Sequence, residues 1–192
     1  MKNFNKDYYR KIAKEKLACL KTSEKIKYDK EIFSKIINSN EYIIANEIFT
    51  YVSFDNEVST IELINYSLKQ NKKVFVPKIL NNKKELKVAK ISSISDLKIG
   101  KYNILEPPDE KVFYKYEFDI LFIPGLCFDY KGIRIGRGKG YFDIFLAKVK
   151  GLKIGLCYSF QVFDKLPSDE HDIKMDKLIT EKEFITFTWN LF

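Results

Sequence analysis

The feature that most constrains this chain is a glycine-rich, cationic stretch at residues 124–146. Four of the eight glycines fall within nine residues, and three cations alternate with them: Gly132, Arg134, Gly136, Arg137, Gly138, Lys139 and Gly140. An apolar run before the stretch, Asp119 to Ile123, predicts a buried strand, and apolar residues at helical spacing predict a helix over Tyr141 to Val149. A strand, a cationic loop and a helix in this order aim backbone N–H groups and a helix N-terminus at an anion such as phosphate.

The stretch matches neither common phosphate-binding fingerprint. About sixteen residues separate Ile123 from the predicted helix, too many for a Gly-x-Gly-x-x-Gly turn, and Lys139 is followed by Gly140 rather than by the Ser or Thr of a Walker A loop. A glycine cluster alone is more often a structural turn. Three like charges so close together are costly unless they are solvated or face an anion, so the pattern favours a phosphate site over a plain turn.

Composition predicts one globular domain over residues 1–192, because 45% of the residues are apolar and 15% are aromatic. Cys19, Cys127 and Cys157 are widely spaced and form no Cys-x-x-Cys pair, which is unlike a disulfide framework or a zinc site and suits a reducing compartment. The first residues lack a signal-peptide core, and no run approaches 18 apolar residues. We therefore expect a soluble, cytoplasmic protein without a membrane partner.

The net charge of +8 is concentrated near the N-terminus, where residues 1–40 hold 11 Lys and Arg against 5 Asp and Glu. Such a segment can be a nucleic-acid arm, a helix whose cations meet a small phosphate ligand, or a solvated lysine-rich face. The solvated face is the commonest of the three. No helix-turn-helix, zinc-finger or RNA-recognition pattern is present, and most aromatic residues follow core patterns, so no nucleic-acid partner is expected.

Hydrophobic periodicity predicts helices alternating with strands. Helices are expected at residues 6–20, 22–37, 60–70 and 141–149, and strands at residues 47–52, 72–77, 85–90, 119–123, 153–157 and 184–189, with an extended segment at 103–108. Thr22 and Ser23 are expected to cap the second helix, Ser59 and Glu62 to form a capping box, and Pro77 to end its strand. This alternation predicts an α/β fold with a mostly parallel sheet covered on both faces.

Ligands in such folds bind beyond the carboxyl ends of the strands, which directs attention to the loops after Val52, Pro77, Ile123 and Cys157. Asp143, in the first turn of the helix that follows the glycines, either stabilises the helix dipole or ligates Mg²⁺ beside phosphates. A second acidic group, at residues 168–172, is either a polar surface loop with a helix cap or a further Mg²⁺ partner.

The chain holds one histidine, His171, and no nucleophile-elbow motif. It therefore offers few of the residues that histidine-based nucleophilic catalysis or transition-metal catalysis needs. Chemistry here should rest on cations, Mg²⁺ and positioning, as phosphoryl transfer does. A non-catalytic nucleotide- or RNA-binding protein that uses the same loop and basic helix is the alternative.

Several ordered motifs resemble the 5-formyltetrahydrofolate cyclo-ligase (methenyltetrahydrofolate synthetase) family. The stretch PGLCFDYKGIRIGRGKGYFDIFL at residues 124–146 resembles the family pattern Pro-Gly-x-x-Phe-Asp, Gly-x-Arg-x-Gly and Gly-x-Gly-Tyr-Tyr-Asp. The other similar motifs are Lys6-Asp-Tyr-Tyr-Arg10, Glu57-Val-Ser-Thr60, Val76-Pro77-Lys78, Tyr102-Asn-Ile, Glu106-Pro107 and His171-Asp172-Ile-Lys-Met-Asp176. They cover most of the chain.

The resemblance implies a Rossmann-like three-layer α/β/α sandwich. It also implies conversion of 5-formyltetrahydrofolate and ATP to 5,10-methenyltetrahydrofolate, ADP and phosphate, with Mg²⁺ and a phosphorylated formyl intermediate. We expect a monomer that accepts the folate with or without a polyglutamate tail.

By family position, the ATP-binding residues would be Lys6, Arg10, Arg134, Ile135, Gly136, Arg137, Gly138, Lys139, Gly140, Tyr141 and Phe142. Substrate would meet Val52, Glu57, Tyr102, Arg137, Gly138, Lys139, Gly140 and Tyr141. Arg137 and Lys139 would act catalytically on the transferred charge, and Asp143 and Asp172 would bind Mg²⁺. Three positions depart from the family pattern: Phe142 replaces a tyrosine, Lys139 stands where many bacterial relatives have glycine, and Ile144 stands where a basic residue often follows the aspartate.

Overall fold

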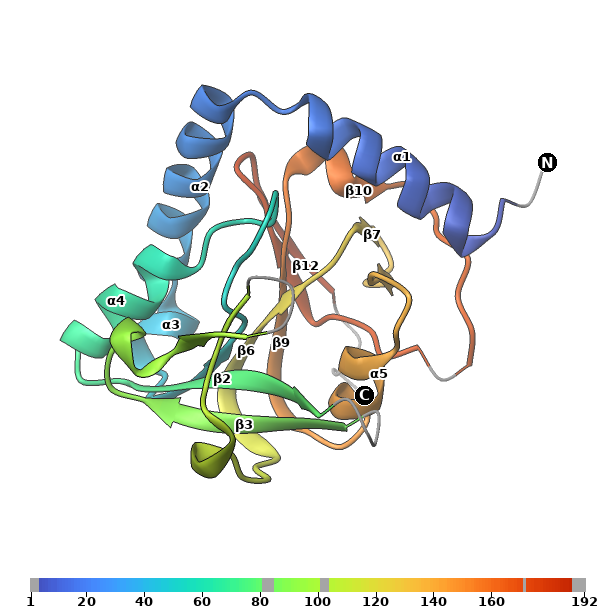
Figure 1. Ribbon diagram of the computed structural model, residues 1–192. Helices are drawn as coiled ribbons and strands as arrows, with labels where there is room; N and C mark the ends of the chain where they lie inside the picture. The colour runs from blue at the N-terminus through green and yellow to red at the C-terminus, as the bar shows by residue number, and fades with distance from the viewer. Residues whose placement is uncertain (1–3, 81–84, 101–103, 171, 188–192) are drawn as a thin grey trace.

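The computed structural model describes residues 4–80, 85–100, 104–170 and 172–187, and it places a seven-stranded sheet at the centre (Figure 1). The strands of this sheet are β1 (Glu47–Thr50), β2 (Lys73–Leu80), β3 (Glu85–Ile91), β6 (Glu117–Pro124), β9 (Lys150–Leu156), β11 (Lys177–Ile179) and β12 (Phe184–Thr186). The helices are α1 (Lys6–Cys19), α2 (Thr22–Ile37), α3 (Asn40–Ile44), α4 (Ile61–Lys69) and α5 (Tyr141–Leu146).

The sheet order is β12-β11-β9-β6-β1-β2-β3, and only the two outermost pairs are antiparallel. The chain builds outward from β1 through β2 to β3, then crosses back to β6 on the other side of β1 and continues to β9 and β11. Strand order therefore reverses between β1 and β6, where open α/β sheets leave a crevice for ligands. The predicted α/β class and mostly parallel sheet are confirmed.

Alternate residues of the central strands face opposite layers, as the pleat requires. Ile120 and Phe122 of β6 pack with the buried residues of α1, α2 and α3, whereas Leu121 and Ile123 pack with Phe145 and Leu146 of α5. Helix α4 lies on the same side as α2 and covers β2 and β3. In the described parts of the chain, α1, α2, α3 and α4 thus cover one face and the short α5 covers the other, which gives an uneven three-layer sandwich.

Three local predictions were wrong. Helix α2 begins at Thr22 with Lys21 as its N-cap residue, where the Lys21 N–H donates to Glu24. Thr60 is the N-cap residue of α4 without a side-chain cap, because its hydroxyl donates to the Tyr51 carbonyl, and Ser59 N–H donates to Asp29 instead. Tertiary contacts occupy the polar groups that the predicted capping box needs.

Pro77 does not end its strand, since β2 runs on to Leu80. Pro77 lies opposite Val88 of β3, and both backbone groups of Val88 are bonded to Phe113 on the other side. An antiparallel pair shares both hydrogen bonds or neither, so no N–H is needed from Pro77 toward β3. Pairing of β2 with β1 ends earlier, at Phe75, so the missing N–H costs no sheet hydrogen bond.

The glycine-rich stretch is more structured than a plain loop. It contains β7 (Cys127–Asp129) and β8 (Arg134–Ile135), an antiparallel hairpin that β10 (Val162–Phe163) extends into a small second sheet. The buried Asp129 carboxylate closes the turn by accepting from the N–H groups of Lys131 and Ile133. Helix α5 begins at Tyr141 as predicted but ends at Leu146. Two short strands, β4 (Lys98–Ile99) and β5 (Leu105–Glu106), pair separately.

Candidate functional site

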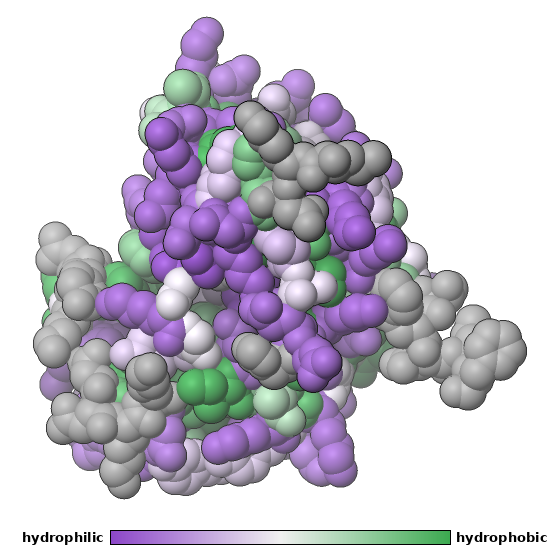
Figure 2. Space-filling model, turned by 90° about the vertical axis from the view of Figure 1, so that its right-hand side faces the viewer, coloured by the Kyte–Doolittle hydropathy of each residue, from purple (hydrophilic) through white to green (hydrophobic). Residues whose placement is uncertain are grey.

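A cavity of about 740 Å³, called the main cavity below, opens at the carboxyl ends of β1 and β6. Its walls come from the residues after β1 (Tyr51, Val52, Phe54 and Glu57), from residues 124–126 after β6, from the glycine-rich stretch, and from the start of α1. The face on which α1 begins and α5 lies is mostly hydrophilic, with smaller apolar areas among the polar side chains (Figure 2).

The basic helix α1 is bonded directly to the glycine-rich stretch. Arg10 Nε donates to the Gly136 carbonyl at 2.9 Å, and Arg10 Nη1 is 2.5 Å from Asp7 Oδ1. Gly138 has a φ of +100°, and a Cβ there would lie 3.4 Å from the Arg10 guanidinium carbon. A contact at that distance is an ordinary van der Waals contact, so it is the positive φ that favours glycine at this position. Helix α1 therefore forms one wall of the cationic end of the cavity.

Arg134 and Asp143 form an ion pair beneath the loop, although they were predicted as a phosphate ligand and a Mg²⁺ ligand. The Arg134 side chain is 3% exposed, and its Nη1 also donates to the Pro124 carbonyl at 3.2 Å. Its Nε is buried with no acceptor among the described residues, and its guanidinium lies 5.8 Å from the Phe142 ring centroid. Arg134 thus holds β6, the loop and α5 together while lining the cavity.

Lys6 connects the start of α1 to the acidic segment near residue 170. Its ammonium lies 2.6 Å from Asp172 Oδ2 and 2.7 Å from Asp169 Oδ2. Desolvation lowers the pKa of Lys6, but the two carboxylates outweigh it and leave the pKa above its usual value. The predicted ATP contact and the predicted Mg²⁺ ligand are therefore partners of each other.

Arg137 and Glu57 meet across the cavity from opposite sides. Arg137 Nη2 is 3.2 Å from Glu57 Oε1, and the guanidinium stacks over the Phe54 ring at 4.3 Å. The Glu57 side chain is 13% exposed, and burial raises its pKa although the Arg137 charge opposes the shift. A buried carboxylate in a cavity, with its pKa shifted by desolvation beside a specific charged partner, is a candidate functional residue.

The segment that carries Glu57 is fixed from behind by Asp29 of α2. Asp29 Oδ1 accepts from the Tyr158 hydroxyl at 2.8 Å and from Ser59 N–H at 3.1 Å, while its Oδ2 lies 2.8 Å from Lys25 Nζ. The Tyr158 hydroxyl also lies 3.5 Å from the Glu57 carbonyl, and the Tyr51 hydroxyl donates to Val58 at 2.9 Å. Sequence reasoning missed Asp29 and Tyr158, because neither belongs to a motif.

The other end of the main cavity is apolar. It is lined by Val52, Phe54, Pro77, Ile79, Ile104 and Leu105. One acid, Glu106, stands at this end and lies 2.8 Å from Lys78 Nζ. The cavity therefore combines a cationic end with an apolar end, the combination needed for an aromatic ligand beside a phosphate chain.

The family model described as the 5-formyltetrahydrofolate cyclo-ligase family matches residues 3–181. The chain belongs to this family. The family resemblance expected from the motifs is confirmed, and with it the enzyme class, a ligase.

Two relatives and two solved structures illustrate the cyclo-ligase similarity. The chain is 29% identical over 181 residues to the mouse 5-formyltetrahydrofolate cyclo-ligase, covering 88% of this chain and 89% of that one. It is 32% identical over 154 residues to the Haemophilus influenzae enzyme, covering 77% and 82%. The NMR structure of Aquifex aeolicus 5,10-methenyltetrahydrofolate synthetase superposes with a TM-score of 0.85 at 33% identity, covering 94% and 92%. The Mycoplasma pneumoniae synthetase gives 0.72 at 27% identity, covering 93% and 99%.

The fold brings most of the predicted cyclo-ligase site residues to the main cavity. Those that line it are Lys6, Arg10, Val52, Glu57, Arg134, Gly136, Arg137, Gly138, Lys139, Gly140, Tyr141, Phe142, Asp143 and Asp172. Ile135 does not line it, since its side chain is buried in the core and its carbonyl accepts from Leu126 N–H. Tyr102 and His171 lie outside the described residues.

Sequence reasoning missed several lining residues, including Phe54, Ile79, Leu105 and Asp169. Phe54 lies in one of the loops that strand order singled out, so position alone could have found it. Ile79 lies two residues after Pro77, in another segment that was singled out, although it belongs to β2 rather than to a loop. Leu105 precedes the Glu106-Pro107 motif, and Asp169 belongs to the acidic segment that was noted.

The proposed Mg²⁺ ligands fit a shared site better than a closed cage. Asp143 and Asp172 both line the main cavity, and carboxylate oxygens are the donors that Mg²⁺ prefers. Each is paired with a cation, and within the described part of the chain no three His, Cys, Asp or Glu side chains gather as a metal site. A Mg²⁺ that takes one or two carboxylates and completes its shell with phosphate oxygens suits this arrangement.

No helix in the described ranges has the length and apolar character needed to cross a membrane.

Proposed function

We propose that this cyclo-ligase family member converts 5-formyltetrahydrofolate and ATP to 5,10-methenyltetrahydrofolate, ADP and phosphate. The observation that carries the proposal is the main cavity itself, which joins the cations of α1 and the glycine-rich stretch to an apolar end, with the Arg137–Glu57 ion pair between the two ends. The names of the relatives, 5-formyltetrahydrofolate cyclo-ligase and 5,10-methenyltetrahydrofolate synthetase, support the same substrate and product.

The chemistry explains why ATP is consumed. An amide-like formyl oxygen is a weak nucleophile and a poor leaving group. Phosphorylation turns this oxygen into part of a phosphate, which is a good leaving group. In the proposed reaction the formyl oxygen attacks the γ-phosphorus, the bond to ADP breaks, and an imidate phosphate forms. The 10-nitrogen then attacks the formyl carbon and loses its proton, and the carbon–oxygen bond breaks to release phosphate. The protein must align the reactants and stabilise the moving charge.

We assign the cationic end to the nucleotide. Lys6 and Arg10 from α1, Arg134 and residues 136–142 would contact ATP, and backbone N–H groups of the glycine-rich stretch would bind phosphate oxygens. Arg137 and Lys139 would stabilise the charge on the transferred phosphoryl group. The contact of Arg137 with Glu57 supports this role, because it places the guanidinium between the two ends of the cavity.

Asp143 and Asp172 would hold Mg²⁺, which when bound neutralises phosphate charge during transfer. In the ligand-free protein these carboxylates are paired with Arg134 and Lys6, and we propose that they change partners when the nucleotide binds. When a phosphate chain enters, each cation gains a second anionic partner and its carboxylate becomes available as a ligand.

We assign the apolar end to the folate. Val52 and Phe54 would contact its ring system, and Glu57 would accept hydrogen bonds from pterin N–H groups, replacing part of its contact with Arg137. Residues 137–141 would border the reacting formyl group. Phe142 stands where the family pattern has tyrosine. The centroid of its ring lies 6.4 Å from that of Phe49, and this contact needs no hydroxyl.

One assay tests the proposal. Purified protein with 5-formyltetrahydrofolate and Mg-ATP should form the methenyl chromophore with one phosphate released per product, and removal of divalent cations by a chelator should stop the reaction. A folded sample that forms no chromophore under these conditions would favour a non-catalytic nucleotide-binding protein instead.

A further inference from the structure

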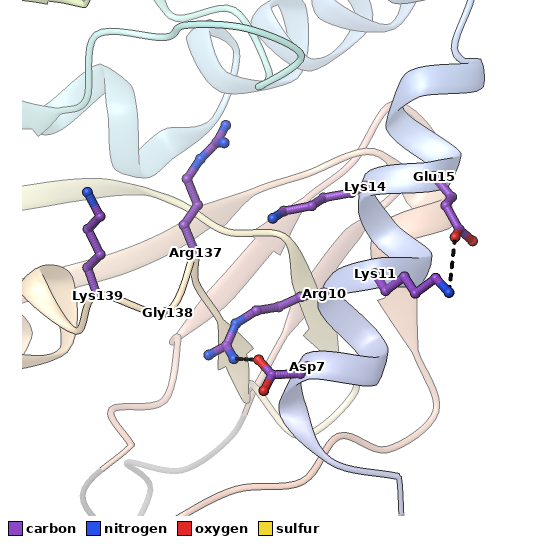
Figure 3. A pocket seen from close by; sticks show the side chains of 8 residues that line it. All are labelled: Asp7, Arg10, Lys11, Lys14, Glu15, Arg137, Gly138 and Lys139. Atoms are coloured by element: carbon purple, nitrogen blue, oxygen red, sulfur yellow. Dashed lines mark hydrogen bonds and ion pairs between the residues drawn. The ribbon is translucent and has the colours of Figure 1, made fainter. Parts of the chain in front are cut away.

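A second cavity, called the outer cleft below, lies beside the main cavity between α1 and residues 137–139 (Figure 3). It measures about 560 Å³. Its cations are Arg10, Lys11 and Lys14 from the helix and Arg137 and Lys139 from the loop, and its carboxylates are Asp7 and Glu15. Lys11, Lys14 and Glu15 belong to no family motif quoted above and line no part of the main cavity.

Both carboxylates of the outer cleft are already engaged on the helix side. Asp7 pairs with Arg10 at 2.5 Å, and Glu15 lies 4.0 Å from Lys11. Figure 3 shows Lys11 reaching along the helix toward Glu15, whereas Lys14 and Arg10 extend across the cleft toward the loop. Lys14 makes no ion pair with any described residue.

Cations that converge from two elements repel one another unless an anion lies between them. Helix α1 and the loop are more than a hundred residues apart in sequence and are joined by the Arg10 bond to Gly136, while Arg137 on the loop is paired with Glu57. The outer cleft and the main cavity share Arg10, Arg137, Gly138 and Lys139. A ligand seated in the main cavity can therefore continue over these residues into the outer cleft.

We infer that the outer cleft binds an oligoanionic segment of a ligand whose remainder occupies the main cavity, with Lys14 as its dedicated cation. The inference rests on the proposed function and extends it. Two parts of the proposed substrates have this chemistry, namely the phosphate chain of the nucleotide and the carboxylates of the folate's glutamate tail. Either group would replace water around the Lys14 ammonium with a direct contact to an anionic oxygen.

The test uses three substitutions at one position in the full-length protein. Lys14→Gln removes the charge, Lys14→Glu reverses it, and Lys14→Arg keeps it. Lys30→Gln is the matched control, because Lys30 is an exposed lysine on α2 that lines neither cavity. KM is measured for Mg-ATP at saturating folate, and then for monoglutamyl and pentaglutamyl 5-formyltetrahydrofolate at saturating Mg-ATP.

We expect Lys14→Gln to raise the KM of one ligand about three- to tenfold, the size expected for the loss of one charge-assisted contact. Lys14→Glu should raise the same KM further. Lys14→Arg and Lys30→Gln should leave it within about twofold of the wild-type value. Raising the salt to about 0.5 M should shrink the difference, since screening shortens the reach of the charge. A rise for Mg-ATP assigns the outer cleft to the nucleotide, and a rise confined to the pentaglutamyl folate assigns it to the tail.

Unchanged KM values in Lys14→Glu for all three ligands overturn the inference, as does an equal rise in Lys30→Gln. Turnover by the wild-type protein tests the proposed function separately. If the wild type turns nothing over, direct binding of Mg-ATP and of pentaglutamyl folate to the wild type and to Lys14→Glu decides the matter, with equal affinities contradicting the outer-cleft site.

Discussion

At the residue scale, a single substitution tests the proposed role of the Lys139 side chain. It lies on the lining of both cavities between two glycines that have positive φ. Lys139→Ala should lower kcat about 10²- to 10³-fold if the ammonium stabilises charge on the transferred phosphoryl group. Lys131→Ala, an exposed lysine in the turn between β7 and β8, is the control and should keep the wild-type kcat. Near-normal turnover in Lys139→Ala would reduce this lysine to a surface cation.

Glu57 gives a prediction that separates stability from activity. Burial raises its pKa, so the folded protein binds this proton more tightly than the unfolded chain does. Below the pKa of Glu57 in the unfolded chain, about 4.3, the side chain is protonated in both states and its ionisation does not affect stability. As the pH rises through the pKa in the folded protein, ionisation of the buried group lowers the free energy of unfolding.

Glu57→Gln removes the titrating group, so its free energy of unfolding relative to wild type should rise as the pH increases above the unfolded pKa of about 4.3, and its KM for the folate should also rise. Denaturant unfolding at several pH values measures the difference. A stability difference that is constant with pH, or that falls, would contradict the assignment of a buried, destabilising carboxylate.

At the element scale, the loop that carries Glu57 depends on contacts from α2 and from Tyr158, two residues after β9. Tyr158→Phe removes the hydroxyl that donates to Asp29 and lies beside the Glu57 carbonyl. It should cost about 1–2 kcal/mol of stability and raise the KM for the folate more than the KM for Mg-ATP. Tyr28→Phe is the control, since its ring lies 6.0 Å from that of Tyr158 and its hydroxyl makes none of these bonds. Equal changes in both KM values would point to a general loss of packing.

Periodicity predicted most helices and strands of this chain, because α1, α2, β1, β3 and β6 bury one regular face or a whole apolar run. It failed where a distant residue decides the local structure. Ser59 and Thr60 bond to Asp29 and Tyr51 rather than to their own helix, and Pro77 is tolerated because its partner Val88 turns both hydrogen-bonding groups away. The β7–β8 hairpin was missed because its strands, of three and two residues, are too short to show an alternating pattern.

The candidate site was predictable as a set of residues but not as a set of contacts. Glycine and cation spacing indicated the loop, and the resemblance indicated α1 and the acidic segment. The pairs Lys6–Asp172 and Arg134–Asp143 each join a predicted cation to a predicted metal ligand, and Lys6 and Asp172 are separated by 166 positions. The Lys6–Asp172 contact depends on the topology of the whole sheet, whereas the Arg134–Asp143 contact, across nine positions, depends on how the chain folds between β8 and α5.

At the scale of the whole molecule, ligand binding should couple α1, the glycine-rich stretch and the acidic segment into one unit. A ligand present at 100 times its Kd stabilises the folded state by about 2.7 kcal/mol. For a chain of this length that corresponds to a rise in Tm of about 5–11 °C. We propose that residues 1–192 form one domain, so Mg-ATP should shift a single transition in calorimetry. Two transitions, of which only one shifts, would contradict a single domain.

Metal dependence and assembly state belong to the same scale. The shift in Tm should shrink when a chelator accompanies ATP, because Asp143 and Asp172 then face phosphates without a cation between them. An equal shift with and without the metal would argue against those two ligands. Light scattering after gel filtration should give the 22.7 kDa of one chain, since we expect a monomer.

The most direct test of the account follows the formyl oxygen. With 5-formyltetrahydrofolate labelled with ¹⁸O in the formyl group and unlabelled Mg-ATP, direct attack on the γ-phosphorus predicts one ¹⁸O atom in each inorganic phosphate released, measured by mass spectrometry. Label that appears in water while phosphate stays unlabelled would contradict phosphoryl transfer to the formyl oxygen, and with it the proposed use of the cationic end of the main cavity.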